Sequence, residues 1–137
     1  MFKKIMVPVD LAHQEILDKA LDVSGKLAKT YNAKVLYVGV TEATPTAVAH
    51  NPAEFQHKLE AFAAKQADLH GIETEPRTFA SHDPATDLNE TLVEASVKLG
   101  ADLIVIASHV PTFADRFWAS HGGTVASRAN ISVMVIR

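Results

Sequence analysis

The sequence predicts an α/β protein with an open five-stranded parallel sheet and helices on both of its faces. Short apolar runs alternate with longer segments in which apolar residues recur every three or four positions, the pattern of strands alternating with amphipathic helices. Two runs, 35–40 and 103–107, are almost continuously apolar, which is typical of strands buried on both faces of a parallel sheet. The 137 residues are the length of one domain, so we expect a single domain spanning 1–137.

The first half of the chain contains two predicted strands, each followed by a predicted helix. The strands are expected at 5–9 and 35–40, and the helices at 13–30 and 53–69. Asn32 and Gly71 stand where these helices are expected to end. The segment 41–52 is predicted to be a loop, because its Thr-Pro-Thr and Asn-Pro pieces interrupt regular structure.

The second half continues the alternation with three strands and two helices. The strands are expected at 72–80, 103–107 and 131–136, and the helices at 83–99 and 119–128. Pro76 favours an edge position for the first of these strands, because proline cannot donate a ladder hydrogen bond. Pro84 suits the first turn of a helix that Gly100 ends.

The composition excludes several classes of protein. The chain has 13 basic and 16 acidic residues, a formal charge of −3, which argues against nucleic acid as a partner because phosphate binding requires a basic face. It has no cysteine, which excludes disulfides, thiolate catalysis and cysteine-ligated zinc. No apolar run approaches the roughly 18 residues of a membrane helix, and no signal peptide is recognisable. We therefore expect no membrane partner and a cytoplasmic location.

A ligand is expected at the carboxyl ends of the strands, because open α/β sheets bind ligands there, where the strand order reverses. The segments to consider follow the first, second and fourth predicted strands and open the last predicted helix. Their residues are Pro8, Val9, Asp10, Val40, Ala107, Ser108, His109, Ala119, Ser120, His121 and Gly122.

Asp10 is the acidic residue expected to face such a ligand. Its carboxylate can accept a hydrogen bond from an adenine amino group or a ribose hydroxyl. The same position, just before a predicted helix, equally suits a helix cap. The sequence leaves both roles open.

The start of the last predicted helix is a candidate phosphate site. Ser120, Gly122, Gly123 and Thr124 lie near a helix N-terminus, where free N–H groups and the helix dipole favour an anion. A Gly-Gly pair also simply makes a turn. The chain has neither a GxxxxGK[ST] motif nor a GxGxxG motif after the first strand.

The seven histidines do not form a recognisable metal motif. Only His109 and His121 are placed where they can share the ligand site, and the others are expected on the surface. No HExxH pair and no GxSxG nucleophile motif is present. We expect neither a metal site nor a catalytic triad.

At these segments the chain resembles the universal stress protein family over nearly its whole length. The resemblance is carried by the stretches IMVPVD (5–10), AKVLYVGV (33–40), DPA (83–85), GADLIVIASH (100–109) and ANISVMVIR (129–137). It implies a Rossmann-like fold of the adenine nucleotide α-hydrolase type, with strand order 3-2-1-4-5.

Nucleotide-binding members of this family carry Gly-x2-Gly-x9-Gly-[Ser/Thr] after the fourth strand, and this chain departs from that motif. An ungapped alignment from the C-terminus puts Ala107, Val110 and Ala119 at the three glycine positions and Ser120 at the last, with one residue fewer between the last two glycine positions. A gapped alternative takes the pair 123–124 as the Gly-Thr. We prefer the ungapped alignment because the other leaves a very short final helix. An alanine at 119 adds a Cβ where backbone should approach phosphate.

The resemblance implies a stress-response regulator that binds ATP or AMP weakly, with Mg²⁺ accompanying ATP. The adenine end would consist of Pro8, Val9, Asp10 and Val40. The resemblance also implies a homodimer paired through the last strand, 133–136, whose apolar edge would otherwise be uncovered.

The alternative is an adaptor of the same fold that binds no nucleotide and contacts an unidentified regulatory protein. It accounts directly for Val110 and Ala119, and Phe117 and Trp118 would be its contact residues.

A third hypothesis is an enzyme that hydrolyses ATP. Phosphoryl transfer needs metal-held phosphates and positioned charge. Asp10, Asp115 and Arg116 are the only candidates near the expected site, and they form no convincing metal pair, so slow hydrolysis is the most that this hypothesis allows.

Overall fold

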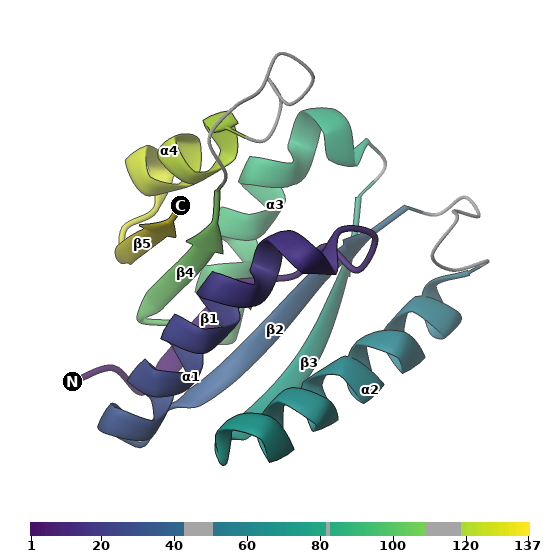
Figure 1. Ribbon diagram of the computed structural model, residues 1–137. Helices are drawn as coiled ribbons and strands as arrows, with labels where there is room; N and C mark the ends of the chain where they lie inside the picture. The colour runs from purple at the N-terminus through teal and green to yellow at the C-terminus, as the bar shows by residue number, and fades with distance from the viewer. Residues whose placement is uncertain (43–50, 82, 109–118) are drawn as a thin grey trace.

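Strands and helices alternate along the chain in the computed structural model, which describes residues 1–42, 51–81, 83–108 and 119–137 (Figure 1). The elements are β1 (Lys4–Pro8), the 3-10 turn η1 (Gln14–Leu17), α1 (Asp18–Tyr31), β2 (Lys34–Thr41), α2 (Pro52–His70), β3 (Glu73–Ala80), α3 (Pro84–Leu99), β4 (Leu103–Ala107), α4 (Ala119–Arg128) and β5 (Ser132–Ile136).

The described strands form one parallel sheet of five strands in the order β3-β2-β1-β4-β5. This confirms the predicted fold class and strand order, and it places β3 with Pro76 at one edge as expected. The predicted helix over 13–30 was wrong at its start, because residues 14–17 form a 3-10 turn and the α-helix begins only at Asp18. Tight turns of this kind are common at helix N-termini.

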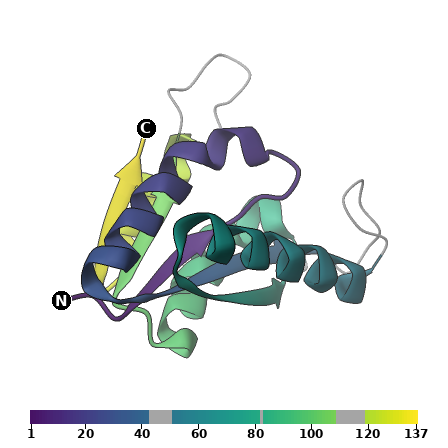
Figure 2. The same ribbon diagram turned by 60° about the horizontal axis from the view of Figure 1, so that its bottom comes forward.

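Helices cover both faces of the sheet (Figure 2), and an apolar layer lies between helices and sheet on each face. Side chains of β1, β2 and β4 that alternate along each strand pack against α1 and α2 on one face, and the intervening ones pack against α3 and α4 on the other. Helix α2 begins at Asn51, whose side chain accepts from the Glu54 N–H at 2.8 Å. Gly71 and Gly100 end α2 and α3 with φ of 63° and 66°, a conformation that glycine adopts without strain.

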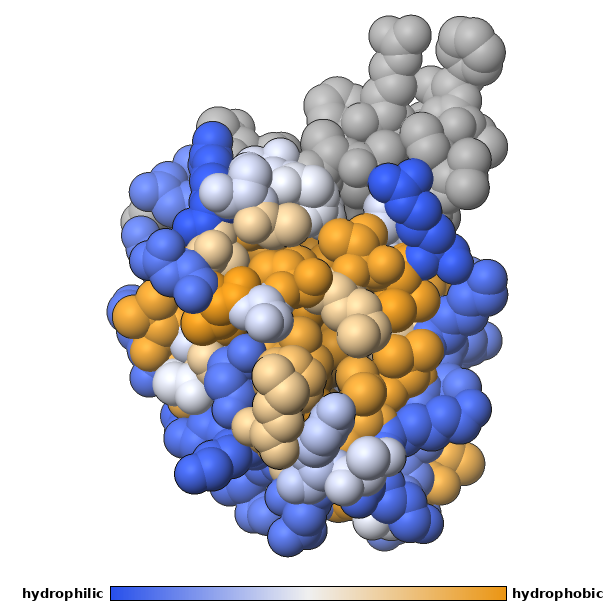
Figure 3. Space-filling model, turned by 90° about the vertical axis from the view of Figure 1, so that its left-hand side faces the viewer, coloured by the Kyte–Doolittle hydropathy of each residue, from blue (hydrophilic) through white to orange (hydrophobic). Residues whose placement is uncertain are grey.

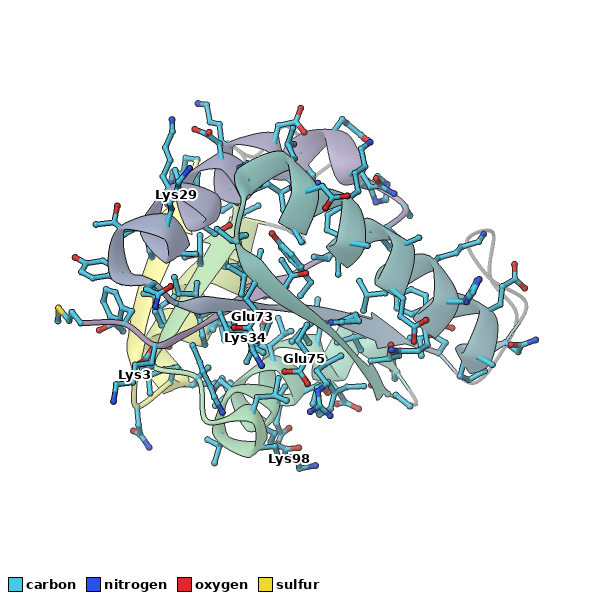
Figure 4. The ribbon with its side chains drawn as sticks, turned by 90° about the horizontal axis from the view of Figure 1, so that it is seen from below. Lys3, Lys29, Lys34, Glu73, Glu75 and Lys98 are labelled. Carbon is cyan, nitrogen blue, oxygen red and sulfur yellow. The ribbon has the colours of Figure 1, made fainter. Side chains whose placement is uncertain are left out.

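The edge strand β3 carries a ladder of charged side chains on the sheet face shared with α3, and these pair with one another and with Lys34 of β2. Lys34 Nζ of β2 lies 3.2 Å from Glu73 and 3.7 Å from Glu75, and Arg77 lies 2.8 Å from Glu75. Figure 4 shows Lys34, Glu73 and Glu75 gathered together. The hydrogen bond from Lys34 to Glu73, and then the charge of Glu73, raise the pKa of Lys34. Charged side chains discourage pairing of an edge strand with another chain.

Tyr37 is a buried polar residue in the core beneath α2. Its side chain is fully buried and its ring packs edge-on against Phe62, with centroids 5.4 Å apart. The hydroxyl has no hydrogen-bond partner among the described residues. Burial raises the pKa of Tyr37 above its usual value, because the phenolate would lose its hydration.

We expect Tyr37 to make the protein sensitive to alkali. Below about pH 10 the hydroxyl of Tyr37 is protonated in both the folded and the unfolded chain, so its contribution to the free energy of unfolding is fully present. Above that pH the unfolded chain loses the phenolic proton and the folded chain keeps it, so stability falls by about 1.4 kcal/mol per pH unit. Urea unfolding across this range should show a smaller fall in Tyr37→Phe. Tyr31→Phe, at an exposed tyrosine, is the control, and equal falls in both variants would contradict the assignment.

Candidate functional site

The strand order reverses between β1 and β4, so their carboxyl ends form the switch point of the sheet. These two strands are neighbours, with Ile5 opposite Leu103 and Met6 opposite Ile104. The chain proceeds from β1 outward to β3, returns to β4 and ends at β5 on the other side. Ligands of open α/β sheets bind at such a point.

Asp10 lies just beyond β1 at this switch point. Its Oδ1 accepts from the Ala12 N–H at 3.0 Å, and its Oδ2 lies 2.9 Å from Nδ1 of His13. Its side chain is 25% exposed. The carboxylate is therefore held in one orientation and remains accessible.

The structure does not support the helix-cap interpretation of Asp10. Leu17 occupies the N-cap position of α1 and His13 that of η1, and neither position has a side-chain capping hydrogen bond. Asp10 instead accepts from a backbone N–H two residues on, which is an Asx turn that precedes both helical segments.

The other predicted residues of β1, β2 and β4 gather at the same end of the sheet. Val9 is buried and its N–H donates to the Val38 carbonyl at 2.8 Å. Ser108 is buried and its N–H donates to the Ile136 carbonyl at 2.7 Å. Pro8, Val40 and Ala107 are half-buried at the ends of their strands. These strand ends lie at the same edge of the sheet as Asp10.

Helix α4 spans Ala119–Arg128 in the described residues. Gly122 is buried, and a Cβ on it would lie 2.9 Å from Cγ1 of Val135. The absence of a side chain therefore lets α4 approach β5. Gly123 is exposed and lies within the helix. Its N–H is therefore not one of the free N–H groups of the first helical turn.

Several predicted residues cannot be placed in full. His109 and Val110 lie outside the described residues, as do the proposed contact residues Phe117 and Trp118 and the pair 115–116. Ala119, Ser120 and His121 are placed only as backbone of the first turn of α4.

His13 is a residue that the sequence reasoning missed. It was expected only among scattered surface histidines, whereas the structure pairs it with Asp10. The available signal was an aspartate directly after a strand with a histidine three positions on. Among the described residues, no group of three or more histidine, cysteine or acidic side chains is arranged to hold a metal ion.

The comparison with protein families decides the identity of the fold. The model of the family described as "Universal stress protein family" matches residues 1–137. The chain belongs to the universal stress protein family. The resemblance seen in the sequence is thereby confirmed.

This universal stress protein is similar in sequence to a bacterial protein and similar in fold to solved structures from an archaeon and a plant. Universal stress protein G of Escherichia coli O157:H7 is 28% identical over 142 residues, spanning the full length of both chains. A universal stress protein from Archaeoglobus fulgidus in complex with dAMP has a TM-score of 0.70 at 17% identity, covering 98% of each chain. A family member from Arabidopsis thaliana with AMP bound has a TM-score of 0.65 at 17% identity, covering 98% of this chain and 90% of its own. At these identities the structures establish the fold.

The described helices include none that is both long enough and apolar enough to cross a membrane.

Proposed function

We propose that this universal stress protein binds an adenine nucleotide, ATP or AMP, at the carboxyl ends of β1 and β4, and acts as a regulator without efficient turnover. Two structures of the same fold hold dAMP and AMP. We place the protein in the cytoplasm as a single domain spanning 1–137, in keeping with the match of the family model to the whole chain.

The observation that carries the proposal is the orientation of Asp10. Its carboxylate is fixed at the switch point of the sheet and is partly accessible. A carboxylate there accepts hydrogen bonds from the amino group or hydroxyls of a nucleoside. Val9 and Val40, at the carboxyl ends of β1 and β2, are the apolar residues that we assign to the base.

The proposed contacts divide into a nucleoside end and a phosphate end. The nucleoside end is assigned to Pro8, Val9, Asp10 and Val40, and the phosphate end to Ala107, Ser108, His109, Val110, Ala119, Ser120, His121 and Gly122. The N-terminal turn of α4 would supply N–H groups to the phosphates. Because the motif glycines are absent, we expect weak binding of the triphosphate.

Magnesium is expected only together with ATP. The described residues hold no cluster of three candidate ligands, and Mg²⁺ in proteins usually keeps water and takes substrate phosphates as ligands. The phosphates of ATP would therefore be the main ligands of the magnesium ion.

We expect saturable binding of Mg-ATP or AMP, and at least about tenfold weaker binding in Asp10→Ala, because a charged acceptor is lost. Isothermal titration calorimetry on protein stripped of nucleotide measures both. Asp22→Ala, which removes an exposed aspartate paired with Lys26 on α1, is the matched control. No binding up to millimolar nucleotide by the unaltered protein would refute the proposal.

That negative result would favour the second candidate, an adaptor without nucleotide. The observation in its favour is the side chain at each glycine position of the phosphate motif, at 107, 110 and 119. A partner protein would then become the ligand to identify.

We further propose a homodimer paired through β5. This strand is the second edge of the sheet, and its apolar residues 133–136 are only half-buried. Figure 3 shows apolar side chains gathered on this side of the molecule. Unlike β3, this edge carries no ladder of charges, so a second copy is its natural cover.

A further inference from the structure

We infer that His13 positions the Asp10 carboxylate for its ligand, an inference that rests on the proposed nucleotide binding. His13 Nδ1 lies 2.9 Å from Asp10 Oδ2, while Asp10 Oδ1 accepts from the Ala12 N–H at 3.0 Å. Each carboxylate oxygen therefore has a partner from the three residues that follow Asp10. With both oxygens engaged, rotation of the carboxylate would break at least one of these contacts.

The backbone around this pair is also restrained. The Asp10 carbonyl accepts from the His13 N–H at 3.1 Å, which closes the turn that carries both side chains. The Val9 N–H donates to the Val38 carbonyl at 2.8 Å, which ties the start of the turn to β2. The pair is therefore arranged before any ligand arrives, and a preorganised group loses less entropy on binding.

The arrangement limits what Asp10 can recognise. An ionised carboxylate offers about four acceptor positions, and two are used by Ala12 and His13. Those that remain fit a pair of neutral O–H or N–H donors, such as adjacent sugar hydroxyls or an exocyclic amine. A phosphate, which carries negative charge, would be repelled. Asp10 with His13 is thus a recognition element for the nucleoside part.

The contact also fixes where the proton of His13 lies. Nδ1 must carry hydrogen to donate to a carboxylate, so the neutral ring should be the Nδ1–H tautomer. We expect ¹⁵N NMR of the ring to show this form in the unaltered protein and to show its loss in Asp10→Ala. A neutral His13 in the Nε2–H form would overturn the inference, and this measurement requires no nucleotide.

The effect on binding is tested with three variants. His13→Ala removes the donor, and we expect about fivefold weaker binding of AMP. His13→Asn places an amide N–H near the position of Nδ1, and we expect most of the affinity to return. His57→Ala is the matched control, because His57 also has an acidic partner three residues away, Glu60, at an exposed site on α2. Unchanged affinity in His13→Ala, or no recovery in His13→Asn, would overturn the positioning role.

Failure of the two proposals can be told apart. An Nδ1–H ring in a protein that binds no AMP would refute the proposed function and, with it, the use of this pair for nucleotide. Binding of AMP with an Nε2–H ring would leave the function standing and refute the role of His13.

Discussion

Replacing Gly39 by alanine is expected to lower the free energy of unfolding by about 2 kcal/mol, because it overfills a packed core. A Cβ at this position of β2 would lie 2.5 Å from Cε1 of Phe55 and 3.3 Å from Cδ2 of Leu59. Both side chains belong to α2 and are buried, so the helix or the ring must shift. Urea unfolding of the two proteins measures the difference.

Gly123→Ala is the matched control for this substitution. Gly123 is exposed in α4 and no atom outside its own helix backbone and chain neighbours lies within 4 Å of the Cβ it would gain. Alanine there should stabilise the protein by up to about 1 kcal/mol, since it is the better helix former. Equal stability of Gly39→Ala and the unaltered protein would show that α2 does not approach β2 as closely as described.

Replacing Val133 by proline is expected to convert the proposed dimer into monomers. The Ser108 N–H donates to the Ile136 carbonyl, so Ile136 and the residues an even number of positions away bond to β4. Val133 therefore turns its N–H toward the free edge. Proline removes that donor without breaking a bond to β4, and it blocks addition of a partner strand.

Light scattering after size-exclusion chromatography measures the mass in solution. Val133→Ala is the control, because it shortens the side chain and keeps the N–H. A monomeric unaltered protein would refute the dimer. A dimeric Val133→Pro with an unchanged circular dichroism spectrum would refute β5 as the interface.

The element order and the fold class could be predicted because both depend on local patterns. The continuous apolar run at 103–107 can be stable only where both faces are covered, and β4 has these bounds in the structure. Pro76 restricts its strand to an edge because it lacks an N–H, and β3 is an edge strand. Gly71 and Gly100 end helices through their own backbone conformation. None of these signals requires knowledge of a distant residue.

The sequence predicted the position of the candidate site in the fold better than it predicted which side chains contact one another there. That Asp10 follows a strand could be read from the chain, and strand order then put it at the switch point. Asp10 pairs with His13 and does not cap a helix, and both facts depend on how the turn folds.

Two further outcomes were decided by packing between elements that are far apart in sequence. The sequence predicts that Gly122 offers its N–H to a phosphate, and the structure shows that its lack of a side chain allows α4 to approach Val135 on β5. In the sequence Tyr37 is simply one residue of an apolar run. In the structure α2 packs closely over it, and its hydroxyl has no hydrogen-bond partner among the described residues. Local patterns specify which segments form strands and helices, whereas the distance between packed surfaces depends on both partners at once.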